Sequence, residues 1–518
     1  MTREQRLALV GAILASTIVT IDAFAVNVAL PAIRRDLGGG FAAQQWVGNG
    51  YLLTLGALIL LAGSLTDRLG ERRVFTLGVA GFGIISLVCA AAPSIGVLIA
   101  ARALQGIAGA LLTPAALAII VAVFPPDVRG GAIGRWTAWS GVGILIGPLL
   151  AGQIVDVASW RWIFAINPPL VIVALVLGRV AVPAGLARAG GSGDTRIDWP
   201  GAVLAAAGLA GISFALIEQP VLGWSSPGIW GALAAGVLLF GTFVAFESHA
   251  RHPMLPLALF GHRGFSVANA QTFAMYGGLS LLTFFQSIYL QQVAGWSALK
   301  AGSTTLVPTG VMFLLSSRVG RLADRLGPRP FLTAGPLVIA VGFALMLRYG
   351  ASVSLPSDVL PAMLVFGLGL SLTVSPLTAT VLGEVPDSSA GIASAVNNAI
   401  ARTAGLIAIA AVGAVVAAQY AASLRAGIGN RLPRSSHAAV VAAERRTFAA
   451  IDLRAVPARD RAVAVHAARH ASERAFHIAS GIGSGLLVIA GIGGGLGLRS
   501  RPRGADGSGA TEPSPADV

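Results

Sequence analysis

Long apolar runs, separated by short polar stretches, recur along almost the whole chain of 518 residues. The hydrocarbon core of a bilayer is about 30 Å thick, and a helix needs about 20 predominantly apolar residues to cross it. We therefore predict an all-α integral membrane protein with fourteen transmembrane helices. These are expected at 7–31, 46–65, 74–92, 95–121, 132–156, 163–182, 200–219, 228–247, 265–290, 301–319, 331–349, 356–382, 389–419 and 477–498.

Composition supports this interpretation and excludes other classes. Hydrophobic residues make up 55% of the chain and charged residues 11%, whereas soluble proteins carry about 25% charged residues. The net charge of +14 would suit nucleic acid in a soluble protein, but in a membrane protein it is typical of basic loops that face anionic lipid. We therefore expect the lipid bilayer, and no nucleic acid, among the partners. The single cysteine, Cys89, leaves no internal disulfide.

The basic residues also predict the orientation. An even number of spans places both termini on one side, and the short segments of that side hold nineteen basic residues against five on the other. Cytoplasmic loops carry the excess of Lys and Arg, so we expect a multi-pass protein of the cell membrane with both termini in the cytoplasm. The exception is an Ala- and Arg-rich extracytoplasmic loop at 420–475, in which we expect one or two short amphipathic helices. His466 and His470 have i,i+4 spacing there but no third ligand, so no metal site is expected.

A short motif, Gly-x-x-x-Asp-Arg-Leu-Gly, occurs twice, about half a chain length apart. Each copy follows the second span of its half on the predicted cytoplasmic side. The residues concerned are Gly63, Asp67, Arg68, Gly70 and Arg72 in the first copy, and Gly320, Asp324, Arg325 and Gly327 in the second. The glycine permits a tight turn, and the carboxylate can cap or pair with a neighbouring helix end. We therefore interpret both copies as gating loops.

The duplication predicts two related bundles. We expect an N-terminal six-helix bundle at 1–182, a linker with inserted helices seven and eight at 183–263, and a C-terminal six-helix bundle at 264–498 that includes the loop 420–475. Residues 499–518 are expected to form a disordered cytoplasmic tail. Transporters built from two such repeats bind substrate at the interface between them, near the bilayer midplane.

Few charges lie inside the spans, and such charges usually mark function because burying them in lipid is costly. Asp22 in span one could exchange a proton with either side or neutralise a cationic substrate. Arg102 in span four stays protonated and needs an anionic or carbonyl partner, which one sequence does not identify. Protonating that partner would link proton binding to a helix shift. Arg402 in span thirteen and Glu218 near the end of span seven are further candidates for substrate binding or coupling.

Span five combines small residues with a proline. Gly143, Gly147 and Gly152 have the spacing that lets helices approach closely, and Pro148 bends the span.

Together these segments resemble the major facilitator superfamily, specifically its fourteen-helix drug:proton antiporter branch. Gly63–Arg73 is similar to the signature loop of the superfamily, Arg102 with Gln105-Gly106 to its span-four motif, and Gly143–Gly152 to its exporter motif in span five. The stretch Asp22–Pro31, which contains Asn27, resembles the span-one motif of the branch, as Trp160–Pro169 and Tyr289–Val293 resemble its other segments. The resemblance implies a proton-coupled antiporter that exports small amphipathic compounds such as drugs or antibiotics. Asp22 and Arg102 would then couple protons, with Asn27 and Gln105 as substrate or coupling residues.

We also expect a monomer that needs no cofactor and takes its energy from the proton gradient. Two alternatives of the same fold remain, a dedicated metabolite exporter and a proton-coupled uptake symporter. A membrane-embedded enzyme or receptor is more remote, because the chain has no Walker loop, zinc-ligand spacing or Ser–His pair, and both terminal segments are short.

Overall fold

The structure is a computed structural model that describes residues 1–181, 197–250, 253–350, 352–386, 389–428, 437–444, 447–448, 454 and 456–498. Throughout these residues the regular structure is helical, and fourteen helical segments are long and apolar enough to cross a membrane. This confirms the predicted fold class and number of spans. Residues 183–196, at the start of the predicted linker, and the predicted tail at 499–518 lie outside the described residues.

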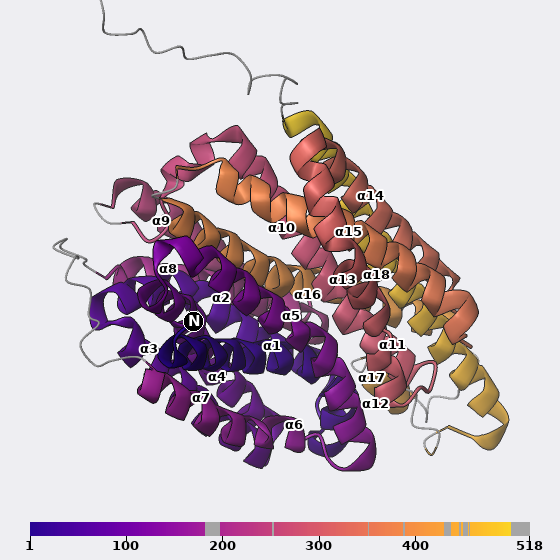
Figure 1. Ribbon diagram of the computed structural model, residues 1–518. Coiled ribbons are helices and arrows are strands. Elements are labelled where there is room, and N and C mark those ends of the chain that lie inside the picture. The colour runs from indigo at the N-terminus through magenta and orange to yellow at the C-terminus, as the bar shows by residue number, and fades with distance from the viewer. Residues whose placement is uncertain are drawn as a thin grey trace, which may run out of the picture.

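The first half contributes six spans, which form one bundle (Figure 1). Its helices are α1 (Arg3–Leu37), α2 (Phe41–Leu69), α3 (Glu71–Ala91), α4 (Ile95–Val123), α5 (Pro126–Val157), α6 (Trp162–Ala165) and α7 (Asn167–Ala181). Helix α1 packs against α5 and α7, and α4 packs against both α2 and α3.

The second half forms another bundle, in which several spans consist of consecutive short helices. Its elements are η1 (Leu257–Gly261), α10 (Arg263–Leu281), η2 (Leu282–Gln286), α11 (Ser287–Gln292), α12 (Ala298–Ser303), α13 (Leu306–Leu326), α14 (Arg329–Leu345), η3 (Met346–Arg348), η4 (Leu355–Val359), α15 (Leu360–Gly383), α16 (Ala390–Ile428), α17 (His437–Glu444), η8 (Ala458–Asp460) and α18 (Arg461–Gly497). Helix α10 packs against α16 and α18, and α15 packs against α13 and α14.

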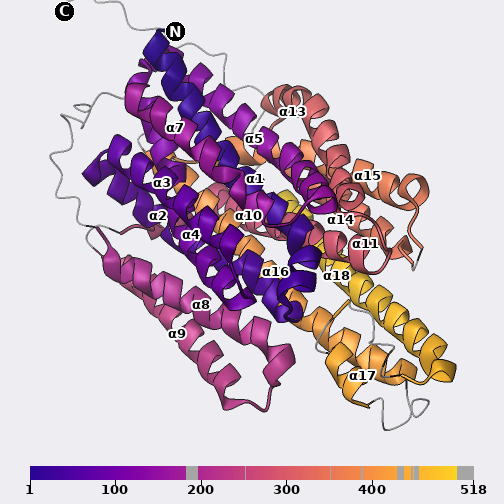
Figure 2. The same ribbon diagram turned by 90° about the horizontal axis from the view of Figure 1, so that it is seen from below.

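The inserted helices form a hairpin of α8 (Trp199–Leu222) and α9 (Pro227–His249). Helix α8 packs against α2 of the first bundle and α16 of the second, so the hairpin covers one flank of the bundle interface (Figure 2). The Trp46 indole N–H donates to Glu218 Oε1 of α8 over 2.8 Å. The insert therefore has a polar anchor on the first bundle in addition to its apolar packing.

The two copies of the repeated motif adopt the same local structure. In each, the Asp-Arg-Leu segment forms the end of a helix, and the following glycine has a positive φ, +88° at Gly70 and +79° at Gly327. Such a φ is strained for any residue with a Cβ. The glycines therefore permit the sharp turns from α2 into α3 and from α13 toward α14.

The region predicted as loop 420–475 is more helical than expected. Helix α16 continues to Ile428 and α18 begins at Arg461, so both extend past the predicted spans, with α17 between them. His466 and His470 lie one turn apart on α18. Among the described residues no group of three or more His, Cys, Asp or Glu side chains could hold a metal ion.

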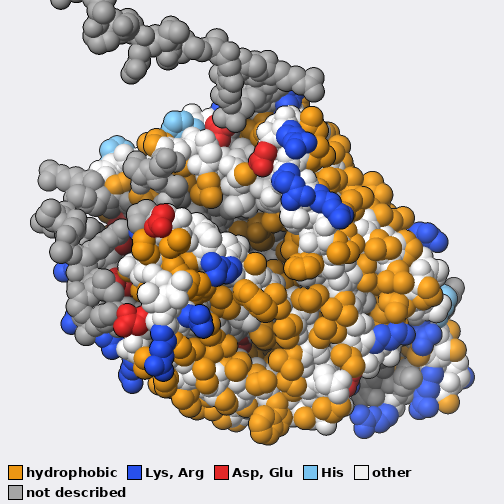
Figure 3. Space-filling view, viewed as in Figure 1, with side chains coloured by type: hydrophobic (Ala, Val, Ile, Leu, Met, Phe, Trp, Pro, Cys, Tyr) orange, Lys and Arg blue, Asp and Glu red, His pale blue; other side chains and the backbone are white. Residues whose placement is uncertain are grey.

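Large apolar side chains cover the exterior, as a bilayer requires. Phe313, Ile489 and Leu496 are 83%, 70% and 74% exposed. Figure 3 shows hydrophobic side chains across the middle of one face, with basic and acidic side chains gathered toward its ends. A soluble protein rarely exposes so large an apolar surface.

Candidate functional site

The centre of the first bundle holds a buried ion pair between α1 and α4. Arg102 donates from Nη1 to Asp22 Oδ2, and both residues are at most 2% exposed. The structure therefore identifies the partner that Arg102 was predicted to need. The two residues are 80 positions apart in the sequence, and the pairing arises because α1 and α4 pack together.

Uncharged polar side chains complete a network around this pair. Gln105 accepts from Arg102 Nη1 over 2.6 Å and donates through Nε2 to Asp22 Oδ1 over 3.2 Å and to Ser86 Oγ over 2.9 Å. Asn167 donates to Asp22 Oδ1 and Ser86 Oγ over 3.4 and 3.2 Å. The Cys89 thiol lies 3.6 Å from Gln105 Oε1. The Asp22 carboxylate thus accepts hydrogen bonds directly from side chains of α4 and α7. It is linked to Ser86 of α3 through Gln105 and Asn167.

Helix α2 supplies further contacts of Arg102. Its Nε donates to the Val47 carbonyl over 3.2 Å, and its guanidinium carbon lies 4.4 Å from the centroid of the Tyr51 ring. Gly106 lies where α4 meets α2, and a Cβ there would overlap the Tyr51 carbonyl. The glycine therefore lets the two helices approach closely enough to hold the guanidinium.

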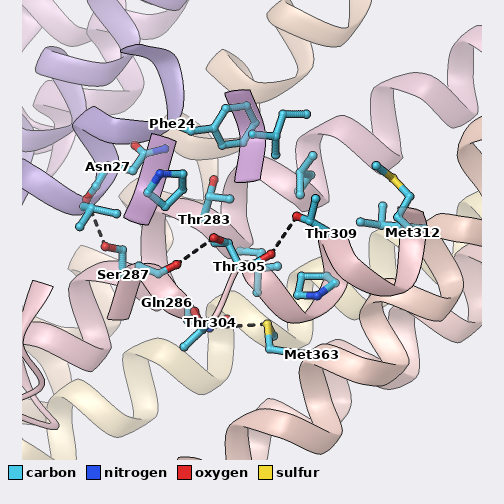
Figure 4. A pocket seen from close by; sticks show the side chains of 18 of the residues that line it. Phe24, Asn27, Thr283, Gln286, Ser287, Thr304, Thr305, Thr309, Met312 and Met363 are labelled. Carbon is cyan, nitrogen blue, oxygen red and sulfur yellow. Dashed lines mark hydrogen bonds between the residues drawn. The ribbon is translucent and has the colours of Figure 1, made fainter. Parts of the chain in front are cut away.

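A separate cavity of about 120 Å³ lies between the two bundles. Phe24 and Asn27 of α1 and Pro148 of α5 line it from the first bundle, opposite side chains of α10, η2, α13 and α15 (Figure 4). The predicted residue Asn27 therefore reaches this cavity, whereas Asp22, on the same helix, faces the interior of its own bundle. Helix α1 thus connects the ion pair to the cavity wall.

The glycines of span five pack α5 against two different partners. A Cβ at Gly143 or Gly147 would lie 3.0 Å from Thr20 Cβ or the Ile21 carbonyl oxygen of α1. A Cβ at Gly152 would lie 2.6 Å from Leu299 Cα of α12, in the other bundle. Helix α5 therefore contacts α1 beside Asp22 and the second bundle nearer its end.

Several contacts between the bundles lie at the end of the molecule where α6, α12 and α17 are labelled in Figure 1, which we call the α17 end. Asp156 accepts the backbone N–H groups of Ala298 and Leu299 over 3.0 and 2.8 Å, capping α12. Arg34 donates to Gln292 Oε1 over 2.8 Å. The Phe41 ring lies 5.9 Å from that of Phe284 and 6.1 Å from those of Phe285 and Phe448. These polar and aromatic contacts close the α17 end.

The other predicted residues lie apart from the ion pair and the cavity. Glu218 accepts from Trp46 on the flank. Arg402 of α16 packs against Gly56 of α2. Arg72 donates to the Arg179 carbonyl over 3.2 Å, joining the first gating loop to α7. In the second motif, a Cβ at Gly320 would lie 2.9 Å from Ser375 Oγ of α15.

Sequence reasoning missed three members of the network, Ser86, Asn167 and Tyr51. All three are at most 1% exposed. Asn167 begins α7 in an Asn-Pro-Pro segment, and a buried amide between two spans is the signal that could have indicated it.

Two related helical bundles, an insert across one flank, an interbundle cavity and a buried ion pair define a membrane transporter. The similarity of the chain to known proteins supports this assignment. The family model of the Major Facilitator Superfamily matches residues 12–410. The chain is 35% identical to the puromycin resistance protein pur8 of Streptomyces alboniger, over 80% of this chain and 82% of that protein. It is 33% identical to the tetracenomycin C resistance and export protein of Streptomyces glaucescens, over 77% and 74%. It is also 33% identical to the multidrug resistance protein Stp of Mycobacterium tuberculosis, over 84% and 80%.

Solved structures show the same fold. A bacterial homolog of the human lysosomal transporter Spinster, in an inward-facing conformation, has a TM-score of 0.64 at 17% identity, covering 96% of this chain and 97% of its own. The D-xylose–proton symporter has a TM-score of 0.53 at 16% identity, covering 80% and 89%. The chain belongs to the Major Facilitator Superfamily. It is a multi-pass membrane protein and a transporter rather than an enzyme, and its relatives are antibiotic and multidrug resistance proteins.

Proposed function

We propose that this protein is a proton-coupled antiporter that exports small amphipathic organic compounds across the cell membrane by alternating access. Both termini lie in the cytoplasm, the α17 end faces outward, and a monomer works without a cofactor on the energy of the proton gradient. The observation that carries the proposal is the Asp22–Arg102 pair, because both side chains are buried in the first bundle and each is the main charged partner of the other.

The chemistry of the pair suits proton coupling. Arginine keeps its proton in any setting of this kind, whereas a carboxylate can accept one. Protonating Asp22 would leave the Arg102 charge buried without a counter-charge, which is unfavourable by about 3–5 kcal/mol. The first bundle relieves this cost by rearranging the hydrogen-bond network. The network then has two arrangements, and proton binding shifts the equilibrium between them.

Two helices connect this rearrangement to substrate. Helix α1 carries Asp22 and, two and five residues further along, Phe24 and Asn27 in the cavity wall. Helix α5 contacts α1 around Ile21 through Gly147 and reaches α12 of the second bundle through Gly152. A shift of α1 on proton binding would therefore move both the cavity wall and the closure at the α17 end.

Relatives support the direction and the kind of substrate. One is named for resistance to and export of tetracenomycin C, another for puromycin resistance and a third for multidrug resistance. Removal of the compound from the cell is the transport direction that resistance requires. We therefore assign export, and propose antibiotics and similar compounds as the substrates.

The test uses inverted membrane vesicles, whose interior corresponds to the outside of the cell. With an acidic interior, wild-type vesicles are expected to accumulate at least one of tetracenomycin C, puromycin and ethidium above the level in vesicles without the protein. Collapse of the pH gradient should release the accumulated compound. Accumulation that does not depend on the pH gradient, or no accumulation of any of the three compounds, would overturn the proposal.

A further inference from the structure

The wall of the interbundle cavity carries no formal charge. Its 22 lining residues include no Asp, Glu, Lys, Arg or His. The Asp22 carboxylate is engaged in the network of the first bundle. A cation in this cavity would lose hydration without gaining a counter-charge from the wall. The cavity is therefore unsuited to cations.

The serine and threonine hydroxyl groups on the second-bundle side of the wall already donate their protons within the protein. Each donates to a backbone carbonyl: Thr283 to Ser280 over 3.2 Å, Ser287 to Asn27 over 3.2 Å, Thr304 to Ala301 over 2.7 Å, Thr305 to Gly302 over 2.8 Å and Thr309 to Thr305 over 2.8 Å. A hydroxyl has one donor and two acceptor lone pairs. This side of the cavity therefore offers acceptors to a ligand, and Figure 4 shows these side chains around the opening.

Gln286 provides a further acceptor. Its Nε2 donates to Thr304 Oγ1 over 3.0 Å, and the Thr304 hydroxyl donates to the Ala301 carbonyl over 2.7 Å. In this orientation Oε1 is the free end of the amide. Gln286 is 4% exposed, and among the described residues Oε1 has no hydrogen-bond partner. A buried acceptor without a donor destabilises the empty site and rewards a ligand that supplies one.

The rest of the wall is apolar and adaptable. Met275, Met312 and Met363 line the cavity from three different helices. Methionine is unbranched and polarisable, and it fits ligands of different shapes. Phe24 of α1 adds an aromatic surface on the opposite side.

We propose that the cavity binds uncharged amphipathic molecules that present a hydroxyl or N–H group to Gln286 Oε1 and an apolar body to the methionines. This inference rests on the proposed function and narrows its substrates: permanent cations are excluded by the lack of a carboxylate in the wall. Gln286 is a specificity-determining residue, and the remaining hydroxyl oxygens accept further donors of the same ligand.

The test compares a matched pair of compounds. Chloramphenicol is uncharged and carries two hydroxyl groups and an amide N–H, whereas its deacylated amine has the same core and is a cation at neutral pH. In the inverted vesicles described above, both are added as competitors while the pH-driven uptake of an accumulated compound is measured. Ethidium serves as a third competitor, an unrelated permanent cation. Wild-type uptake should be inhibited by chloramphenicol at concentrations about tenfold or more below those needed for the amine or ethidium.

Three variants connect the result to the wall. Gln286→Leu should raise the inhibitory concentration of chloramphenicol by about two- to tenfold, as loss of one hydrogen bond predicts. Gln286→Glu should lower the inhibitory concentration of the amine, because it places a carboxylate in the wall. Gln419→Leu is the matched control, since Gln419 lies on α16, bonds Ser423 over 3.0 Å and does not line the cavity. It should change neither value.

The outcomes separate this inference from the function on which it rests. If pH-driven uptake is present but ethidium or the amine competes as well as chloramphenicol, only the substrate class is wrong. The same conclusion follows if Gln286→Leu leaves the chloramphenicol value unchanged while uptake persists. If no compound is driven by the pH gradient, the antiporter proposal itself fails.

Discussion

Replacing Asp22 with Asn removes one negative charge from the centre of the first bundle with almost no change in volume. The Asn oxygen can still accept from Arg102, but its NH₂ group would face the donors that Gln105 and Asn167 now direct at Asp22 Oδ1 over 3.2 and 3.4 Å. The Arg102 charge would remain buried without a counter-charge. Breaking a buried pair destabilises a protein by about 3–5 kcal/mol, and the retained hydrogen bond places Asp22→Asn near the lower figure.

The effect on coupling is larger than the effect on stability. Exchange of one proton for one uncharged substrate allows at most about a tenfold gradient per pH unit, because one pH unit corresponds to about 1.36 kcal/mol. Asparagine cannot carry the proton, so the ratio of substrate concentrations inside and outside the vesicles should fall to one for Asp22→Asn. Exchange of labelled for unlabelled substrate without a pH gradient should continue, because it needs no proton.

The assay is accumulation in inverted vesicles with a pH step of one unit, beside thermal unfolding of the purified protein. Asp36→Asn is the matched control on the same helix: Asp36 pairs with Arg161 over 3.2 Å, with side chains 49% and 34% exposed. Such surface pairs contribute only about 0–1 kcal/mol, so this variant should accumulate like wild type. The double variant Asp22→Asn/Arg102→Met should regain stability but not coupling, since apolar replacements of buried pairs are often neutral. Wild-type accumulation by Asp22→Asn would refute the role of Asp22.

Three further predictions concern helix contacts. Gly106→Ala should destabilise the protein by about 1–3 kcal/mol, because its Cβ would overlap a carbonyl of α2; Gly96→Ala, on the same helix with nothing within 4 Å of its Cβ, should leave the unfolding temperature unchanged. Gly152→Ala should slow transport by preventing close packing of α5 on α12, whereas Gly141→Ala on α5, also in open space, should not; equal rates for the two variants would contradict this. Asp156→Ala should speed hydrogen exchange of the first backbone amides of α12 about fivefold or more, because it removes a cap worth about 1 kcal/mol. Hydrogen exchange is measured by mass spectrometry, and an unchanged rate would show that the cap does not stabilise the closed α17 end.

Much of the fold follows from local sequence because lipid imposes a length rule. Each span needs enough apolar residues to cross the bilayer, so their number could be predicted from one sequence. This length rule did not predict the extensions of α16 and α18. Residues 461–476 are rich in alanine and arginine, which favour helix without being apolar enough to count as a span, and the hydrophobic criterion therefore assigned them to a loop.

The site was predictable only in part, because charges are conspicuous in an apolar sequence and neutral polar groups are not. Asp22 and Arg102 could be chosen for their cost in lipid, but their pairing depends on helix packing across 80 positions. Ser86 looks like any serine in a membrane helix until Gln105 and Asn167 are seen to donate to it. Gln286 gave no sequence signal, because its free oxygen depends on its contact with Thr304.

Cys89 gives the protein a practical property for spectroscopy. It is the only cysteine in the chain, is fully buried and lies beside Gln105 in the network of the ion pair. A maleimide should reach this thiol only when the centre of the first bundle opens, so its labelling rate reports on that opening without any engineered residue. Cys89→Ala in turn provides a thiol-free background in which a pair of spin labels, one on each bundle, can measure the distance between the bundles during the transport cycle.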